Sequence, residues 1–350
     1  MDKKILVLAD PTSIHTKKWI KGWEYIGYQT VLSGLSNKKN KNKNIFYAKI
    51  SSTGRNGIKY IKNILNFSKV LKNEQFTIIN THYMSSYGLI GALIKQKKHK
   101  LVLFLPGSDV MIDMNRNFIY SLMAKFVLYR TDVLVSVSET MTNKIVTKFP
   151  SLHSKILTQQ YGVDIQFLDK FFTKKKEIDV ITNRQWKPNS NYPVLLNTFA
   201  SFQTNINFKL IGYDKSSYAK ELLDKYKSLI PYSVGIVSYE ENLSYVSKSK
   251  IFISLTSSDG IPLSLIEAIY LGAIPIVSDI EPNRELIKDG INGFIVSITK
   301  NSLQKKIEDV LQLNKEEIEK IQQYNKNLVL KKFDFKKNFQ RLEKRLKENR

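Results

Sequence analysis

The sequence predicts an α/β fold made of two doubly wound, Rossmann-like domains that face one another across a cleft. Short apolar runs alternate with segments of helical spacing along most of the chain, and a basic, aromatic stretch interrupts this alternation once, near the middle. A strand, a helix and a strand within about 30 residues form a βαβ unit, which implies a parallel sheet. A chain of 350 residues has the length expected of two such domains.

The first series begins with the apolar run at residues 3–10, which is too short for the core of a signal peptide and is expected to be a strand. Further strands are expected at residues 29–34, 76–82, 100–105 and 132–138. Helices are expected at residues 16–28, 58–73, 86–96, 117–130 and 139–149. The lysine- and asparagine-rich residues 36–44 are expected to form a solvated surface loop.

The basic, aromatic residues 164–177 break the alternation, and we interpret them as the linker between the domains. In the second series, strands are expected at residues 178–184, 208–213, 233–238, 251–258, 273–279 and 293–298. Helices are expected at residues 194–202, 218–229 and 241–249, directly after Pro262, and in the C-terminal region. In such α/β domains a ligand binds at the carboxyl ends of the strands.

The net charge of +24 is concentrated in the first half of the chain. Residues 1–175 hold 28 Lys and Arg against 10 Asp and Glu, a net of +18, whereas residues 176–350 hold 27 against 21, a net of +6. A basic domain suggests an anionic partner, such as nucleic acid, an anionic membrane surface or a phosphorylated substrate. A solvated, lysine-rich surface explains the same charge without any partner.

The composition also bears on compartment and metal binding. The absence of cysteine excludes disulfides and cysteine-ligated metal sites. No apolar stretch reaches the about 18 residues of a membrane span, so a cytoplasmic location is expected. Four scattered histidines and the absence of an Asp-x-Asp motif make a dedicated metal site unexpected.

Two carboxylates lie in one short apolar segment, SSDGIPLSLIEAIYLGAIPIVSD, at residues 257–279. Asp259 follows an expected strand, Gly260 allows a turn with positive φ, Pro262 suits the first turn of a helix, and Glu267 lies one to two turns further on. Both acids would border a helix N-terminus, which favours phosphate, and they would accept hydrogen bonds from hydroxyls of a ribose or a sugar. Alternatively, Asp259 caps the helix and Glu267 pairs with a nearby lysine.

This segment, together with the later DGINGFIV, resembles the C-terminal signature of family 4 glycosyltransferases, which are retaining, use nucleotide sugars and have the GT-B fold. That family carries two glutamates around a Gly-(Phe)-Pro turn; here the second is Glu267, and the first is replaced by the shorter Asp259. The resemblance implies that Glu267 holds the ribose hydroxyls of the donor and that Asp259 lies at the donor sugar. The resemblance also implies that the donor sugar and phosphate lie close to the backbone of Gly260, Ile261, Pro262 and Leu263.

The resemblance extends over nearly the whole chain. DVITNRQWKPNSNYPVLLNTFASF is similar to the start of the family's donor domain, where an Arg and a Lys neutralise the diphosphate leaving group. Arg184 matches the first of these, and Lys187 is the nearest candidate for the second, although it comes earlier than the usual lysine. Both could instead be ordinary surface cations. Gly212 would let the backbone approach the donor, and Ser238 lies in the stretch 236–239 expected to contact the base.

In the N-terminal half, candidate acceptor residues follow the expected strands. His15 lies in the loop after the first strand, His82 ends another strand, and Ser138 and Glu139 lie where a strand gives way to a helix. An ordinary surface histidine and a structural histidine are the alternatives for His15 and His82.

The stretch FLPGSDV departs from the family pattern. Many relatives carry a His-Gly-type motif there, whereas this chain has Pro106 before Gly107, so no catalytic histidine is expected at this strand. The backbone of Gly107, with Ser108 or Asp109, would line the site instead.

The resemblance implies an acceptor-binding domain at residues 1–170, a donor-binding domain at residues 171–330, and a helix at residues 331–350 that crosses back to the first domain. It implies a retaining hexosyltransferase that moves a sugar from a nucleotide sugar, a co-substrate, to a glycan or a lipid-diphosphate-linked acceptor, with neither metal nor other cofactor. Bacterial surface polysaccharide, such as capsule or O-antigen, is the expected setting. The donor base, the sugar, the linkage and the oligomeric state stay open.

Other classes of function stay open as well. The same fold could serve a sugar-nucleotide epimerase or a phosphorylase, or the chain could be a non-catalytic polyanion-binding or partner subunit. Nucleic acid is not the expected partner, because the basic residues are spread along the domain without an RNP-like or helix-turn-helix motif. The segment TKKWIKGWEYIGY suits peripheral contact with the inner face of an anionic membrane, but its Trp19 and Trp23 could equally be core residues.

Overall fold

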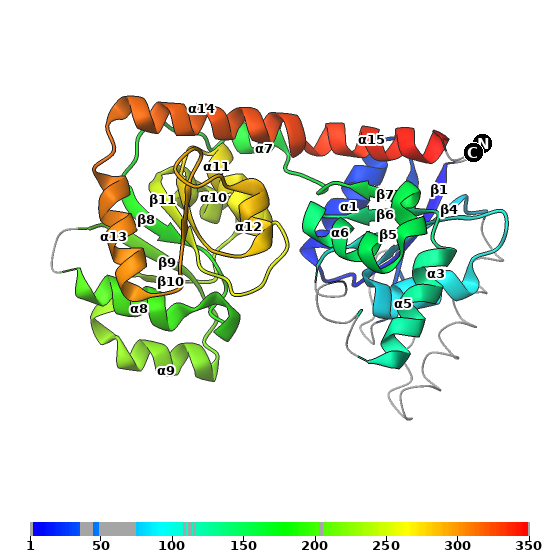
Figure 1. The fold of residues 1–350 in the computed structure, drawn as a ribbon, viewed down its shortest axis with the longest axis horizontal. Helices are drawn as coiled ribbons and strands as arrows, with labels where there is room; N and C mark the ends of the chain where they lie inside the picture. Colours follow the sequence, from blue (N-terminus) through cyan, green and yellow to red (C-terminus); the bar gives the residue numbers. More distant parts are fainter. Residues whose placement is uncertain are drawn as a thin grey trace. The chain divides into compact units, whose positions relative to one another are not determined.

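The computed structural model describes residues 3–35, 45–48, 75–107, 110, 114, 117–202 and 206–348. The chain divides into two compact units, residues 1–161 with 335–350 and residues 162–334 (Figure 1). The helix expected at residues 58–73 and the loop expected at residues 36–44 lie outside the described residues.

The first unit is built on a parallel sheet whose described strands follow the order β3-β2-β1-β4-β5-β6-β7. The strands are β1 (Lys4–Leu8), β2 (Gln29–Leu35), β3 (Ile45–Ala48), β4 (Ile78–His82), β5 (Lys100–Leu105), β6 (Val133–Ser136) and β7 (Ile156–Thr158). The chain runs outward from β1 to β2 and β3 and then crosses to β4 on the other side of β1, so the sheet is doubly wound as predicted. The short strands β3 and β7 were not expected from the sequence.

The helices of the first unit follow the strands in the expected alternation. Within the described residues they are α1 (Ile14–Tyr25), a π-helix (Tyr83–Gly88) that continues into α3 (Leu89–Ile94), α5 (Phe118–Arg130), α6 (Glu139–Lys148), a short 3-10 helix (Pro150–Lys155) and, from the end of the chain, α15 (Phe335–Glu348).

Two tryptophans on α1 form part of the core of the first unit. Trp19 and Trp23 are fully buried, and the ring of Phe339 on α15 lies 5.0 Å from the ring of Trp19. Gly22 leaves room for this ring, because a Cβ at that position would lie 2.0 Å from Phe339 Cζ. Trp19 and Trp23 are therefore core residues, and the alternative that they contact a membrane is wrong.

The second unit has a parallel sheet with the described strand order β10-β9-β8-β11-β12-β13. The strands are β8 (Ile178–Thr182), β9 (Phe208–Tyr213), β10 (Ser233–Gly235), β11 (Ser249–Ser254), β12 (Ile274–Ser278) and β13 (Phe294–Val296). The helices are α7 (Ile165–Asp169), α8 (Tyr192–Ser201), α9 (Ser217–Lys225), α10 (Tyr239–Ser247), α11 (Leu263–Tyr270), α12 (Glu281–Leu286), α13 (Lys300–Leu311) and α14 (Lys315–Lys332), with short 3-10 turns at Pro188–Ser190 and Lys227–Tyr232.

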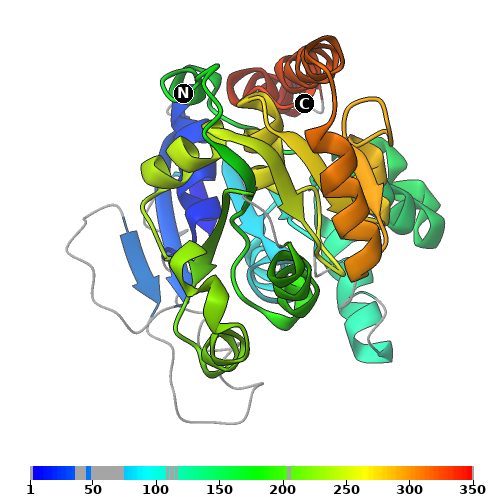
Figure 2. The same cartoon turned by 90° about the vertical axis from the view of Figure 1, so that its left-hand side faces the viewer.

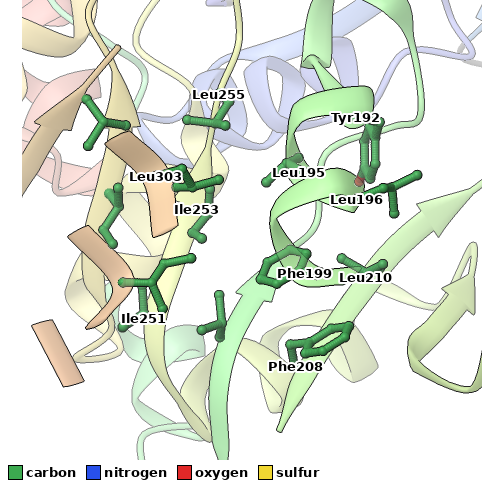
Figure 3. Packing of buried hydrophobic residues seen from close by; sticks show 14 of the residues in the cluster. Tyr192, Leu195, Leu196, Phe199, Phe208, Leu210, Ile251, Ile253, Leu255 and Leu303 are labelled. Carbon is green, nitrogen blue, oxygen red and sulfur yellow. The ribbon is translucent and has the colours of Figure 1, made fainter. Parts of the chain in front are cut away.

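Helices cover both faces of this second sheet (Figure 2). Along β11, Ile251 and Ile253 pack on one side with α8 and α13, whereas Phe252 packs on the other side with α10 and α11. Figure 3 shows the first of these layers, in which Leu195 and Phe199 of α8 approach the strands. A strand buried on both faces reads as a continuous apolar run, which is why these strands were recognisable in the sequence.

Residues 164–177 are not a linker. They contain α7, whose Leu168 is fully buried, and Tyr270 donates a 2.6 Å hydrogen bond to Asp169. Lys176 donates to the carbonyls of Ser247 and Leu271, at 2.6 and 2.9 Å, and burial lowers the pKa of its ammonium group to about 8. The stretch is thus packed into the second unit through Leu168, Asp169 and Lys176.

The two unit boundaries differ accordingly from the expected residues 170 and 330. The first unit ends at Tyr161, and the second extends to Asp334 because α14 packs against α11. The returning element is α15 alone, which begins at Phe335 and belongs to the first unit.

Candidate functional site

Two loops meet at the carboxyl ends of β8 and β11, which are neighbouring parallel strands. Asn189, after β8, donates from Nδ2 to the carbonyl of Ser258 at 3.0 Å and accepts from the Ser258 amide at 3.1 Å. Asn191 has a left-handed backbone, φ +52°, and its Nδ2 donates to the carbonyl of Leu255 at 2.6 Å. These bonds hold the two loops against one another, so the side chains that they carry have fixed positions.

An ion pair joins the two loops at their tips. Arg184 Nη2 donates to Asp259 Oδ2, and Arg184 Nη1 lies 3.4 Å from the hydroxyl of Ser264 in the first turn of α11. The side chains of Arg184 and Asp259 are 21% and 24% exposed, so both remain within reach of a ligand. The structure therefore brings together the two residues that the sequence placed at the leaving group and at the donor sugar.

Asp259 does not cap α11, because the N-cap position is occupied by Pro262. Its second oxygen, Oδ1, instead accepts a 2.8 Å hydrogen bond from the amide of Gly260. This bond closes the turn locally, and Gly260 is not among the glycines of positive φ. The expected left-handed turn at Gly260 is therefore wrong, and the capping alternative for Asp259 is wrong too.

Gly212, near the end of β9, does have a left-handed backbone, φ +98°. A Cβ at this position would lie 2.7 Å from the carbonyl oxygen of Arg184. The hydroxyl of Tyr192 donates to that same oxygen at 2.6 Å. The close approach that glycine permits here is thus between β9 and the backbone of Arg184, and it fixes the base of the arginine side chain.

Glu267 is a buried carboxylate, 4% exposed, in the middle of α11. The hydroxyl of Tyr239, the first residue of α10, donates to Glu267 Oε1 at 2.6 Å. The ring of Tyr239 stacks on that of Phe167 with a centroid distance of 5.8 Å and an interplanar angle of 4°. Burying a carboxylate is costly unless it is hydrogen-bonded. The hydrogen bond from Tyr239 lowers this cost and orients the Glu267 carboxylate, an arrangement that packing alone does not require.

The remaining donor-side candidates lie around this core. Ser238 is exposed and caps α10 by accepting from the amide of Glu241 at 3.1 Å, and Lys187 is exposed on the loop after β8. Ile261 and Pro262 are buried beneath the turn, and Leu263 begins α11 half-buried.

In the first unit, the candidate residues follow β1, β4, β5 and β6, which are adjacent in the sheet, so their carboxyl ends lie along one edge. His15 is exposed near the start of α1, and its Nδ1 lies 2.6 Å from the hydroxyl of Tyr161. Gly107 follows β5 with φ +151°. Ser138 caps α6, accepting from the amide of Met141 at 3.2 Å, and Glu139 is exposed beside it. Ser108 and Asp109 lie outside the described residues.

His82 ends β4 and is buried, 2% exposed, between aromatic rings. The rings of Trp19 and Phe104 lie 5.7 and 5.3 Å from its imidazole. Burial, with a smaller contribution from His15, lowers the pKa of His82 to about 3. The imidazole is therefore neutral at physiological pH, and it packs against the aromatic rings of Trp19 and Phe104.

No group of three or more histidine or carboxylate side chains suited to a metal ion is found within the described residues. In the same part of the chain, every helix is too short or too polar to span a bilayer.

Several residues of the donor-side site escaped the sequence reasoning. Tyr239, Ser264, Asn189, Asn191 and Tyr192 each hold a candidate residue or its loop in place. The one local signal was the run Asn189-Ser190-Asn191 directly after a strand, since asparagine favours left-handed and loop conformations. The others are ordinary tyrosine and serine residues whose partners lie far away in the sequence.

Comparisons with known proteins match both halves of the chain. Residues 4–138 match the family model described as glycosyl transferase 4-like, and residues 164–328 match that of glycosyl transferases group 1. An uncharacterized glycosyltransferase of Methanocaldococcus jannaschii is 24% identical over 343 residues, covering 93% of this chain and 91% of that protein. The capsular polysaccharide biosynthesis glycosyltransferase CapH of Staphylococcus aureus is 26% identical over 234 residues, covering 63% and 64%.

Solved structures resemble the whole chain. A glycosyltransferase from Rickettsia africae superposes with a TM-score of 0.79 at 16% identity, covering 99% of this chain and 98% of that one. HepE of Anabaena, in complex with UDP and glucose, superposes with a TM-score of 0.80 at 12% identity, covering 99% and 100%. At these identities the likeness concerns the fold.

Proposed function

This chain belongs to the family 4 glycosyltransferases of GT-B fold, and from that premise we propose that it binds a nucleotide sugar in its second unit and transfers the sugar with retention of configuration. The acceptor is a glycan or a lipid-diphosphate-linked sugar. The observation that carries the proposal is the pair of Arg184 and Asp259 at the N-terminus of α11.

Arg184 is placed to stabilise the leaving group. When the bond between the sugar and the nucleoside diphosphate breaks, negative charge develops on the phosphate oxygens. A guanidinium group held by Asp259 at the start of α11 offers fixed N–H donors there, and the first backbone amides of the helix add to the positive potential. Lys187, exposed on the same loop, supplies a further cation. The proposal needs no metal, because these groups provide the positive charge.

The two carboxylates have different tasks. Glu267, whose orientation Tyr239 sets, accepts hydrogen bonds from the ribose hydroxyls. Asp259 contacts the hydroxyls of the donor sugar and keeps Arg184 in place before the donor arrives. Retention follows from attack on the face from which the diphosphate leaves, so that the leaving group takes up the proton of the acceptor hydroxyl.

Surface polysaccharide synthesis at the inner face of the cell membrane is the proposed setting. The relative CapH, named for capsular polysaccharide biosynthesis, supports it, and so does the net charge of +18 in residues 1–175. A basic domain is attracted to a membrane surface that carries anionic lipids and lipid diphosphates. The protein would then act as a cytoplasmic, peripherally bound enzyme.

Thermal unfolding with a panel of UDP-, GDP-, ADP-, CMP- and dTDP-sugars tests the donor site. One nucleotide should raise the midpoint of the wild type and of a Glu319→Gln control, which removes an exposed acid on α14, but not that of Glu267→Gln. No shift with any donor would contradict the proposal and favour a partner subunit. Donor turnover without an acceptor, or only with phosphate, would favour an epimerase or a phosphorylase.

A further inference from the structure

The helix α5 exposes an apolar face. Phe118, Ile119, Leu122, Phe126 and Tyr129 are between 41% and 76% exposed, and all five lie on this helix of 13 residues. Single exposed apolar residues are ordinary, but a contiguous group of large ones marks a surface that binds something.

The opposite face of α5 is apolar as well. Ala124, Val127 and Leu128 are fully buried against the rest of the first unit. A surface helix normally opposes its buried stripe with polar residues, and a helix that is apolar all round is normally covered on every side. The outer face of α5, defined by the five exposed residues named above, is therefore unlike that of an ordinary surface helix.

Among the described residues, the charge on α5 and on the segments next to it is mostly positive. Residues 75–107 and 117–131 contain six Lys and Arg and no Asp or Glu. Two of them, Lys125 and Arg130, lie on α5 itself, and Lys97 and Lys98 are exposed just after α3. The next acid along the chain, Asp132, is already paired with Lys95 at 2.6 Å.

The helix α3 extends the same surface. Arg130, at the end of α5, donates from Nε to the carbonyl of Ala92 on α3 at 3.3 Å, so the two helices lie side by side (Figure 1). Leu93 of α3 is exposed, and the basic Lys97 and Lys98 follow it in the chain. Among the described residues, the apolar face is thus bordered by a rim of basic side chains, namely Lys97, Lys98, Lys125 and Arg130.

We propose that the outer face of α5 docks the protein on the surface of an anionic bilayer. Phe118, Ile119, Leu122 and Phe126 enter the boundary between headgroups and acyl chains, while the lysines and arginines of the rim contact the headgroups. An amphipathic helix of this type gains binding energy from buried apolar area and from attraction to anionic lipid. The inference deepens the proposed function, and rests on it, because it assigns a surface to the membrane contact.

The charge pattern favours a bilayer over a second copy of the chain. In a two-fold dimer the same patch meets itself, so Lys125 and Arg130 would face the basic residues of the same patch on the second copy. A bilayer with anionic headgroups supplies the missing negative charge.

Co-sedimentation of the full-length protein with vesicles tests the proposal. The vesicles consist of phosphatidylcholine alone or mixed with phosphatidylglycerol. The wild type should bind the mixed vesicles, more weakly at high salt, and the Leu122→Gln/Phe126→Gln variant should bind them at least about tenfold more weakly. The Ile230→Gln/Ile291→Gln variant, which removes two exposed apolar residues of the second unit, should bind like the wild type.

The proposal is overturned if the wild type does not bind the mixed vesicles, or if the α5 variant binds them as tightly as the wild type. It is overturned too if the wild type sediments as a dimer without vesicles and the same variant makes it monomeric. The donor-induced thermal shift of the α5 variant separates this inference from the proposed function. A variant that loses vesicle binding and keeps the donor shift is folded and supports the α5 surface. Vesicle binding by a wild type that no nucleotide sugar stabilises would leave the α5 surface standing and contradict the donor site.

Discussion

The carboxyl ends of the two sheets differ in chemistry. In the second unit they carry opposite charges that are paired and partly exposed, as in Arg184 and Asp259, and a buried carboxylate held by a tyrosine. In the first unit, at the end of β4, the neutral His82 lies against the rings of Trp19 on α1 and Phe104 on β5. Among the described residues at the strand ends, the paired charges of Arg184 and Asp259 lie in the unit proposed to bind the diphosphate. Two similar folds thus carry different sites because their loops, rather than their sheets, set the chemistry.

Removing the cation of the second unit should have the largest effect. Arg184→Ala is expected to lower kcat by roughly 10²- to 10³-fold, because stabilisation of the leaving group is lost in the transition state. Steady-state kinetics with the donor found by the thermal screen measures it. Arg184→Lys should retain part of the activity. Lys187→Ala, at an exposed position, should lower kcat by roughly tenfold or less. A kcat for Arg184→Ala within threefold of the wild type would refute the assigned role.

The backbone beneath Arg184 should be nearly as sensitive. Gly212→Ala is expected to lower the free energy of unfolding by roughly 3 kcal/mol, because alanine is strained at φ +98° and its Cβ would meet the Arg184 carbonyl. Gly290→Ala is the matched control, since Gly290 also has positive φ but open space around it. This substitution should lower the free energy of unfolding by roughly 1 kcal/mol. Denaturant unfolding compares the two, and equal losses would show that the contact with Arg184 is unimportant.

The histidine of the first unit should make stability depend on pH. The pKa of His82 is about 3 in the folded protein, below its ordinary value of 6.5, so between these values the unfolded chain takes up a proton that the folded protein does not. Stability should fall as the pH falls from 6.5 to 3, by about 2 kcal/mol between pH 7 and pH 5.

Unfolding of the wild type and of His82→Gln, each measured at pH 7 and pH 5, isolates this effect. The variant starts less stable at pH 7 but should lose about 2 kcal/mol less on acidification, since its side chain does not titrate in this range. Identical losses in the two proteins would mean that His82 is accessible to protons in the folded state.

The smallest expected effect concerns the tyrosine of the second unit. Tyr239→Phe removes the 2.6 Å hydrogen bond to Glu267 while keeping the ring stacked on Phe167. We expect the KM for the donor to rise about fivefold to tenfold with little change in kcat, which corresponds to the loss of one ordinary hydrogen bond. A drop in kcat with an unchanged KM would place Tyr239 in the chemical step rather than in orienting Glu267.

Much of the fold was predictable because its signals are local. The strand at Lys100–Leu105 has the predicted bounds, and Phe208–Tyr213 does as well, since both are continuous apolar runs between polar loops. The three-residue β7 was missed, because Ile156–Thr158 is half-buried and too short for a period to show. Residues 164–177 were misread as a linker, because their lysines hid the buried Leu168 and the carbonyl-capping Lys176.

The candidate site was predictable to a smaller degree. The spacing of Asp259 and Glu267 around a Gly-Ile-Pro turn pointed to the start of a helix, and the two residues flank the start of α11, Asp259 in the loop before it and Glu267 near its middle. Their partners were not predictable, since Arg184 is 75 residues from Asp259 in the chain and Tyr239 is 28 residues from Glu267. The sequence predicted that Gly212 lets the backbone approach the donor, whereas in the structure Gly212 lies against the backbone of Arg184.

By itself, the sequence determined the parallel α/β architecture, the family and the two acids of the turn, because periodicity and motif are properties of neighbouring residues. Only the tertiary structure decided that Trp19 and Trp23 are core, that His82 is buried among rings, and that the apolar face left uncovered lies on α5. The physical reason is that burial and pairing depend on which distant segments pack together. An apolar residue looks the same in the sequence whether its helix turns it inward, as Val127, or outward, as Phe126.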